Sequence, residues 1–437
     1  MSVRAVLLEP IPEAAVPSAF IRWYALLAMC LVYTVSIADR YVISTVLEPI
    51  RLELHLSDSG VAFLTGVSLS LFYVSFGIPL SLLVDRVNRC RIIAVCMTLW
   101  SALTVLCGIA MNYWQLLFAR IGVGIGEAGG TPAASSIISD YFPAGRRPMA
   151  LTVFSLGAPL GAWVGYSLAG RIADAFGWRS VFLALGVPGI VFGGLVYFTV
   201  REPKRGRLDA VGDGTKPSLI ETAKFLWSQR AACHLMLGSA VTALWGWGLT
   251  WWTPAFLMRN YALTIGQAGT ITGPIHLVGG IVATVFTAWL LSRPFMYDPR
   301  RVVWFLGSGV AIATVPSIVI FATHSLELTK IMFWIFIPFI YFYIGPCFGI
   351  LNNLSPPRMR GQFCAATLLV ANVGNLIIAP QLVGALSDFF APGHLANAAS
   401  LRLALLCLAP SGFWSAFHFF WCTRTLRQEQ QRAIGLA

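Results

Sequence analysis

Four ionisable side chains lie inside long apolar segments of this chain, where an unpaired charge would be costly. They are Asp39, Arg40, Arg120 and Glu127. Ionisable residues within membrane-spanning segments pair with one another and mark ion or substrate pathways. The protonation of a carboxyl group depends on its burial and on nearby Arg side chains. A carboxylate that gains and loses an Arg partner can therefore take up and release a proton.

The spacing of these residues indicates which of them can meet. A helix rises about 1.5 Å per residue, which places Asp39 and Arg120 at similar depths, so we expect them to pair. Glu127 follows Arg120 by about two turns, on the same helix face and near the middle of the membrane. Arg40 is turned away from Asp39 by about 100° around its helix. We expect Asp39 and Glu127 to couple proton movement; the alternative is a static pair that holds the helices together.

Arg40 and Arg120 are the candidates for holding an anionic group of a solute, and later segments add an aromatic and mildly polar set. We expect Trp247, Tyr341 and Asn372 to contact the solute. For the Trp-rich segment around Trp247, the alternative is an aromatic belt at the membrane interface. His276 is more consistent with a packing residue than with a proton relay.

The composition shows what kind of elements must position these residues. Hydrophobic residues make up 57% of the 437 residues and charged residues only 11%, and the mean hydropathy is +0.75. A soluble domain has roughly 25% charged residues. The apolar stretches have about the length needed to cross a bilayer and lack the alternation of barrel strands. We predict an all-α membrane protein with twelve spans, at 20–49, 58–84, 91–110, 113–140, 147–173, 179–199, 231–258, 265–291, 301–322, 328–353, 359–387 and 400–423.

The longest polar stretch divides these spans into six and six. We predict an N-terminal six-helix bundle over 1–200, a linker with a short amphipathic helix over 201–230, and a C-terminal bundle with its tail over 231–437. Most of the 30 Lys and Arg residues lie at the termini and in the loops on the same side. By the positive-inside rule, both termini are cytoplasmic and the protein lies in the inner cell membrane. The net charge of +12 therefore needs no nucleic-acid partner to explain it.

Short motifs recur in the two halves at nearly equal offsets. Gly170–Asp174 ends the fifth span as Gly384–Asp388 ends the eleventh, and Asp85 follows the second span as Asp298 follows the eighth. These matches predict two pseudo-symmetric bundles built as parallel repeats. Proteins built in this way bind their solute between the repeats, near the middle of the membrane.

The loop after the second span resembles a signature of the major facilitator superfamily. Asp85 matches the Asp of that signature and its basic positions are matched by Arg86, Arg89 and Arg91, whereas Ser81, Asn88 and Cys90 depart from it. The resemblance implies a cytoplasmic gate formed by Asp85, Arg86, Arg89 and Asp140. In this gate Arg86 or Arg89 pairs with Asp140, and Asp85 faces a helix N-terminus of the other half. The alternative is that these charges only anchor the chain on the cytoplasmic side.

The fourth span and its continuation, from Arg120 to Pro143, resemble the spinster-type branch of that superfamily. Asp39–Arg40 and the Gly177–Arg179 segment fit the same branch. The resemblance covers most of the N-terminal half, and we expect a bacterial member. It implies export of sphingolipid-like or lysolipid solutes.

These observations predict a secondary transporter that works by alternating access and is proton-coupled. The expected solute is an amphipathic, anionic, lipid-like molecule such as a lysolipid or a sphingoid phosphate; the alternative is a small organic or aromatic anion. We expect a monomer in contact with membrane lipids, with no metal and no cofactor. The sequence lacks the GxxxxGK[ST] loop that binds nucleotide phosphates, and its six His residues are scattered, which argues against an ATP-driven pump and against an enzyme.

Overall fold

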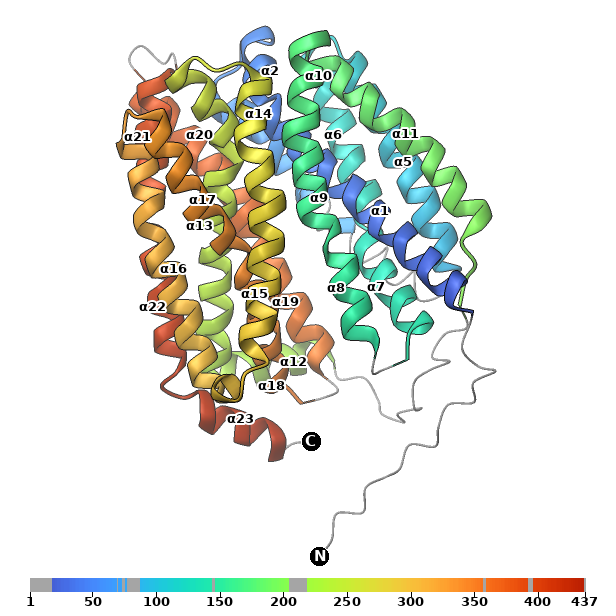
Figure 1. The fold of residues 1–437 in the computed structure, drawn as a ribbon, viewed down its shortest axis with the longest axis vertical. Helices are drawn as coiled ribbons and strands as arrows, with labels where there is room; N and C mark the ends of the chain where they lie inside the picture. The colour runs from blue at the N-terminus through green and yellow to red at the C-terminus, as the bar shows by residue number, and fades with distance from the viewer. Residues whose placement is uncertain are drawn as a thin grey trace, which may run out of the picture.

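The computed structural model describes residues 18–435, apart from 69, 73–74, 77–86, 144–145, 204–217, 357–358 and 392–395. Within these residues the regular elements are all helical. Figure 1 shows two groups of helices side by side, α1 to α11 (the N half) and α13 to α23 (the C half). The start of α1 and the helix α23 lie at one end of the molecule, which we call the terminus-side end; α2, α10, α14 and α20 reach the opposite, far end.

The N half contains the following elements: α1 (Ala19–Thr45), α2 (Leu47–Glu53), α3 (Asp58–Ala62), η2 (Phe63–Val67), α5 (Arg89–Ile109), α6 (Tyr113–Glu127), α7 (Gly130–Tyr141), α8 (Arg147–Ser155), α9 (Gly157–Trp163), η4 (Val164–Leu168), α10 (Ala169–Phe176) and α11 (Trp178–Thr199). The linker helix α12 (Leu219–Ser228) precedes the C half. The C half contains α13 (Arg230–Tyr261), α14 (Ile265–Pro274), η5 (Ile275–Gly279), α15 (Gly280–Leu291), η6 (Pro294–Tyr297), α16 (Pro299–Ala322), α17 (Leu326–Phe342), α18 (Ile344–Asn353), α19 (Arg360–Asn372), η8 (Val373–Ile378), α20 (Ala379–Phe390), α21 (Ala398–Leu408), α22 (Ser411–Cys422) and α23 (Leu426–Gly435).

These helices confirm the predicted all-α membrane fold. Among the described residues, nine helices are long and apolar enough to cross a membrane. The other three predicted spans correspond to the segment that starts with α3 and η2, to α6 and α7, which a turn at 128–129 separates, and to α13, which is 32 residues long. The predicted amphipathic linker helix is α12. The division at residues 200 and 231 stays a prediction.

Polar side chains cap the helices where the chain enters them. The Asn112 side chain accepts from the Gln115 N–H at the start of α6. Thr264 and Gln267 form a reciprocal capping box at the start of α14. Such caps satisfy N–H groups that have no partner within the helix. They fix where the spans begin, and so the depth at which the charged residues lie.

A π-helical turn interrupts the second, fifth, eighth and eleventh spans: η2, η4, η5 and η8. Each of these spans packs against a span of the opposite half, as η2 does against η8 and α14 against η4. Gly66 illustrates how close the backbones come, because a Cβ at that position would lie 2.8 Å from the Leu376 carbonyl oxygen. π-helical turns are rare and frequent at functional sites. Here they mark where the two halves meet.

Toward the terminus-side end the halves diverge, with α7 and α8 on one side and α15 and α19 on the other (Figure 1). At the far end they touch: a Cβ on Gly384 would lie 2.7 Å from the Asp58 carbonyl oxygen, and α10 packs against α14. The structure is therefore closed at the far end.

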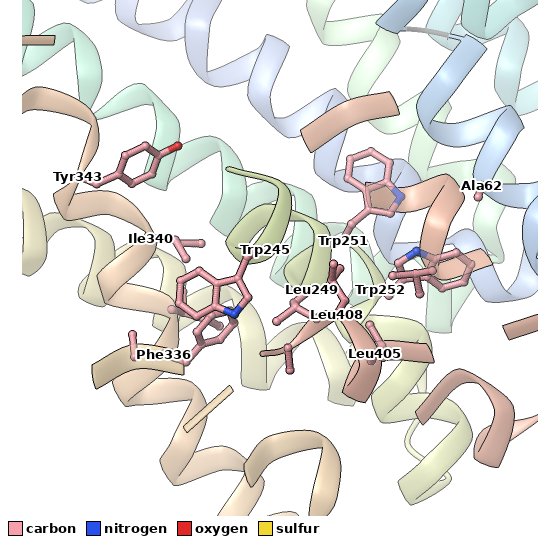
Figure 2. Packing of buried hydrophobic residues seen from close by; sticks show 14 of the residues in the cluster. Ala62, Trp245, Leu249, Trp251, Trp252, Phe336, Ile340, Tyr343, Leu405 and Leu408 are labelled. Atoms are coloured by element: carbon pink, nitrogen blue, oxygen red, sulfur yellow. The ribbon is translucent and has the colours of Figure 1, made fainter. Parts of the chain in front are cut away.

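The core of the C half is built around the Trp residues of α13. Trp245 and Trp252 are fully buried and Trp251 nearly so, and they pack with Phe336, Leu405 and other apolar residues, as Figure 2 shows. An aromatic belt at the membrane interface is therefore the wrong interpretation for these three residues. Trp247, on the same helix, is only partly buried.

Candidate functional site

Asp39 and Arg120 form a buried ion pair between α1 and α6, as predicted. Arg120 Nη1 donates to Asp39 Oδ2 at 2.9 Å, and the Thr104 hydroxyl on α5 donates to Asp39 Oδ1 at 2.8 Å. The Arg120 residue is 0% exposed and Asp39 1%. A buried charge is tolerated when it is paired and hydrogen-bonded. Asp39 therefore holds three spans of the N half together.

The neighbouring residues form a second pair. Arg40 Nε donates to Glu127 Oε2 at 2.8 Å, and the Arg40 side chain is 17% exposed while that of Glu127 is fully buried. The sequence predicted that Arg40 points away from Asp39, but it did not identify Glu127 as its partner. Glu127 Oε1 has no hydrogen-bond partner within the described part of the chain. The site therefore combines two carboxylates and two guanidinium groups. Of these four side chains, that of Arg40 is the most exposed.

An aromatic layer lies between the halves and begins at the residue after Arg40. It consists of Tyr41 and Tyr166 from the N half and Trp247, His276 and Tyr341 from the C half. The Tyr41 and Tyr166 ring centroids lie 4.8 Å apart, those of Trp247 and Tyr341 5.3 Å apart, and those of Tyr166 and His276 5.1 Å apart.

The structure thus brings together Trp247 and Tyr341, which the sequence had marked as candidates for solute contact. Their solute-binding role stays a prediction. Sequence reasoning missed Tyr41 and Tyr166, although Tyr41 directly follows Arg40. Asn372 is partly buried at the end of α19, where η8 begins. Its side chain makes no hydrogen bond to the rest of the described chain, so its proposed role also stays a prediction.

A charge network, which we call the far-end lock, joins the halves through Glu48, Asp58 and Arg259. Arg259, at the end of α13, donates from Nη1 and Nη2 to the two carboxylate oxygens of Asp58, both at 2.7 Å, and from Nε to Glu48 Oε2 at 2.7 Å. Arg51 also donates to Glu48, at 2.8 Å. All three side chains of the lock are at most 6% exposed. Sequence reasoning missed them because charges at the ends of spans are common.

The repeated Gly-x-x-x-Asp motif makes the two related contacts beside this lock. Asp388 accepts from the N–H groups of Asp58 and Ser59 at 2.9 Å each and so caps the start of α3. Asp174 accepts from the hydroxyl of Thr264, the N-cap of α14, at 2.6 Å. Carboxylates favour helix N-termini. Each half therefore places the Asp of the same motif at a helix start of the other half: Asp388 caps the backbone of α3, and Asp174 holds the N-cap residue of α14.

Arg89 and Asp140 form the pair that the sequence predicted for the gate. Arg89 Nη1 donates to Asp140 Oδ2 at 2.6 Å, and Arg89 Nε donates to Glu202 Oε1 at 2.6 Å. Glu202, which sequence reasoning missed, lies just after α11 and also accepts from the Cys90 N–H. All these residues belong to the N half, so the pair joins spans within one half. Asp85 and Arg86, the other predicted gate residues, lie outside the described residues.

Replacing Arg89 with Ala is expected to lower the free energy of unfolding by about 3 kcal/mol, because it removes the buried cation that pairs with both Asp140 and Glu202. The thermal melting of the purified protein in detergent measures this change. Arg91→Ala is the matched control, since Arg91 lies on the same helix and is exposed. Equal melting temperatures for the two variants would contradict the prediction.

Comparisons with known proteins agree with this architecture. Residues 29–379 match the model of the Major Facilitator Superfamily. An MFS-type efflux pump of Mycolicibacterium smegmatis is 29% identical over 391 residues, which cover 89% of each chain. The sphingosine-1-phosphate transporter SPNS2 of Danio rerio is 28% identical over 371 residues, covering 80% of this chain and 73% of that protein.

A solved structure is similar over nearly the whole length. It is the crystal structure of a bacterial homolog to the human lysosomal transporter Spinster in an inward-facing and unoccupied conformation. The TM-score is 0.84 at 28% identity, with 94% of this chain and 99% of that chain covered. The family match covers most of the chain, and both bundles are present. The chain therefore belongs to the Major Facilitator Superfamily, as a multi-pass membrane transporter of the spinster-like type and not an enzyme.

Proposed function

We propose that this protein is a proton-coupled secondary transporter that moves an amphipathic, anionic, lipid-like solute by alternating access. The observation that carries the proposal is the paired site of Asp39, Arg40, Arg120 and Glu127. Two carboxylates and two guanidinium groups lie deep within the spans, and one guanidinium group is partly exposed. A relative that is named a sphingosine-1-phosphate transporter supports the solute class.

In the proposed proton step Glu127 is the titrating group. Protonation of Glu127 removes its negative charge, and its bond to Arg40 weakens. The Arg40 guanidinium group then binds an anionic group of the solute in place of Glu127. Asp39 stays paired with Arg120 and keeps α1, α5 and α6 in place. Proton binding and solute binding are linked in this way because both act on the Arg40 side chain.

Alternating access requires the far-end lock to open while the terminus-side end closes. The far end is closed in the structure described above, and the similar crystal structure is inward-facing. We infer that the terminus-side end faces the cytoplasm of the cell and that the protein lies in the inner membrane as a monomer. Trp247, Tyr341 and Asn372 would contact the solute. Asp85, Arg86, Arg89 and Asp140 would support closure on the cytoplasmic side.

One relative favours a second candidate, a proton-coupled carrier of a small organic anion. A probable L-galactonate transporter of Escherichia coli is 25% identical over 410 residues, covering 89% of this chain. Arg40 would bind the carboxylate of such a solute, and the same proton step would apply. The two candidates differ in whether an acyl chain is needed for transport.

Transport into proteoliposomes, with and without a pH gradient, tests the proposal. Lysophosphatidic acid, sphingosine 1-phosphate, galactonate and benzoate serve as probes. We expect gradient-dependent flux of the two lipids and little flux of the two small anions. Flux of galactonate or benzoate alone would favour the second candidate. Full lipid flux by Arg40→Ala would contradict the role given to Arg40.

A further inference from the structure

His276 occupies an unusual position in the aromatic layer. It lies in the π-helical turn η5 and is 0% exposed. Its ring contacts those of Tyr41 at 5.6 Å, Tyr166 at 5.1 Å, Trp247 at 6.4 Å and Tyr341 at 5.9 Å between centroids. One of its ring nitrogens has a hydrogen-bond partner, the Tyr341 hydroxyl.

The two nitrogen atoms of His276 are treated differently by the surrounding residues. Nδ1 lies 2.8 Å from the Tyr341 hydroxyl, whereas Nε2 is buried and makes no hydrogen bond to any described residue. A neutral imidazole has one donor and one acceptor nitrogen. The bond to Tyr341 uses one of them, and the other is left for a partner that the described chain does not supply. Buried polar atoms are nearly always satisfied, so such an exception needs an explanation.

The layer has an accessible side and a buried side. Tyr41, Trp247 and Tyr341 are partly buried, whereas Tyr166 and His276 are fully buried. Tyr166 lies in η4 and His276 in η5, so the two π-helical turns meet through this pair of rings. Because Tyr41 and Tyr166 belong to the N half, a rocking motion of the halves would withdraw them from His276. The imidazole would then face the space between the halves.

Arg40 precedes Tyr41 on α1, so it lies at nearly the same depth as this ring, about 1.5 Å away along the helix axis and about 100° around it. A solute whose anionic group reaches Arg40 would therefore extend toward the His276 ring. The rings that contact His276 carry no formal charge, so a neutral group that can hydrogen-bond suits Nε2. A hydroxyl fits best, since it donates and accepts and so satisfies Nε2 in either tautomer.

We propose that His276 Nε2 binds a hydroxyl group of the solute, so that the transporter selects anionic amphiphiles with a free hydroxyl close to the phosphate. Tyr341 acts as the positioning residue that holds the imidazole. The inference rests on the proposed function, because it assumes that a lipid-like anion is carried. It adds to that function the requirement that the solute carries a free hydroxyl group.

The test compares two probes in proteoliposomes: lysophosphatidic acid and its analogue with the same acyl chain and phosphate but without the glycerol hydroxyl. For the wild-type protein we expect KM to be about fivefold lower for the probe with the hydroxyl, the ratio typical of one neutral hydrogen bond. His276→Phe should remove this preference by raising KM for that probe alone. His276→Gln should keep part of it, because an amide can donate and accept.

His234→Phe is the matched control, since His234 pairs with His418 outside the layer, and it should keep the full preference. If the wild type moves neither lipid, the proposed function fails and this inference fails with it. If the wild type moves both equally well, or if His276→Phe keeps the preference, only the inference fails. If His276→Phe does not fold, Tyr341→Phe serves as the test variant. We expect its preference for the probe with the hydroxyl to fall about twofold, and an unchanged preference overturns the inference.

Discussion

Replacing Glu127 with Gln is expected to uncouple transport from the pH gradient. Gln has nearly the same shape and can still hydrogen-bond, but it neither binds nor releases a proton. With one proton per solute, a gradient of one pH unit can sustain about a tenfold ratio of solute concentrations, since a factor of ten corresponds to about 1.36 kcal/mol. In Glu127→Gln this ratio should fall to about one, while exchange of solute without a gradient continues.

Proteoliposomes with a fixed internal pH and a varied external pH measure this ratio. Glu327→Gln is the matched control, because Glu327 forms an exposed pair with Lys330 at 2.7 Å and lies outside the paired site. A Glu127→Gln protein that still accumulates solute in response to the gradient would show that the proton binds elsewhere.

Replacing Glu127 tests proton coupling more clearly than replacing Asp39, because the two carboxylates have different surroundings. Both oxygens of Asp39 are hydrogen-bonded, to Arg120 and Thr104. Loss of the Asp39 charge would leave Arg120 fully buried without a carboxylate, which is costly for folding. One oxygen of Glu127 has no hydrogen-bond partner in the described chain, and its Arg40 partner is partly exposed. Glu127 can therefore change its protonation with less damage to the fold.

The charged site could be predicted in part from the sequence. Charges within apolar segments are rare enough to stand out, and helical rise gives their depth, which was sufficient to predict the Asp39–Arg120 pair. Helical rise does not give the direction in which a long Arg side chain reaches. For this reason the Arg40–Glu127 pair emerged only from the packing of α1 against its neighbours.

The contacts at the far end show a different limit of prediction from the sequence. The repeat of Gly170–Asp174 and Gly384–Asp388 was visible in the sequence, but it served only as evidence for two similar halves. Its role in contacts at two helix starts of the opposite half depends on which span lies opposite which, and one sequence does not contain that information. The π-helical turns were also invisible, because the residues of η4 and η5 are as apolar as those of the α-helical turns beside them.

Replacing Arg259 with Gln is expected to open the far end. Arg259 is the cation of the C half that joins Asp58 and Glu48, and all three side chains are buried. Arg51 of the N half also lies 2.8 Å from Glu48 and 3.6 Å from Asp58. Without Arg259, the two carboxylates in the closed interface would share Arg51 alone, and removing one member of a buried ion pair costs about 3 to 5 kcal/mol. In the open state water can solvate both carboxylates, so the cost falls on the closed state alone. The ratio of open to closed molecules should rise by about a hundredfold or more.

Distances between spin labels measure this shift. Phe176 and Phe389 are 78% and 80% exposed at the far end of the N and C halves, and Cys at these positions can be labelled after the nine native cysteines have been replaced. We expect a longer distance to dominate in Arg259→Gln. The contacts of Asp388 and Asp174 also join the halves and separate when the far end opens. The packing within each half is unchanged in this variant, so both halves should stay folded.

Arg179→Gln provides the control for a lost Arg at the same end. Arg179 Nη1 pairs with Glu53 Oε1 at 2.6 Å, and both residues belong to the N half. Hydrogen bonds from Trp178 and Arg179 hold the pKa of Glu53 below its usual value, so this pair is charged at neutral pH. Its loss does not separate the halves, and the short distance should persist. If Arg259→Gln also kept the short distance, the helix caps and the close glycine contacts alone would hold the far end closed, and the lock would have no part in gating.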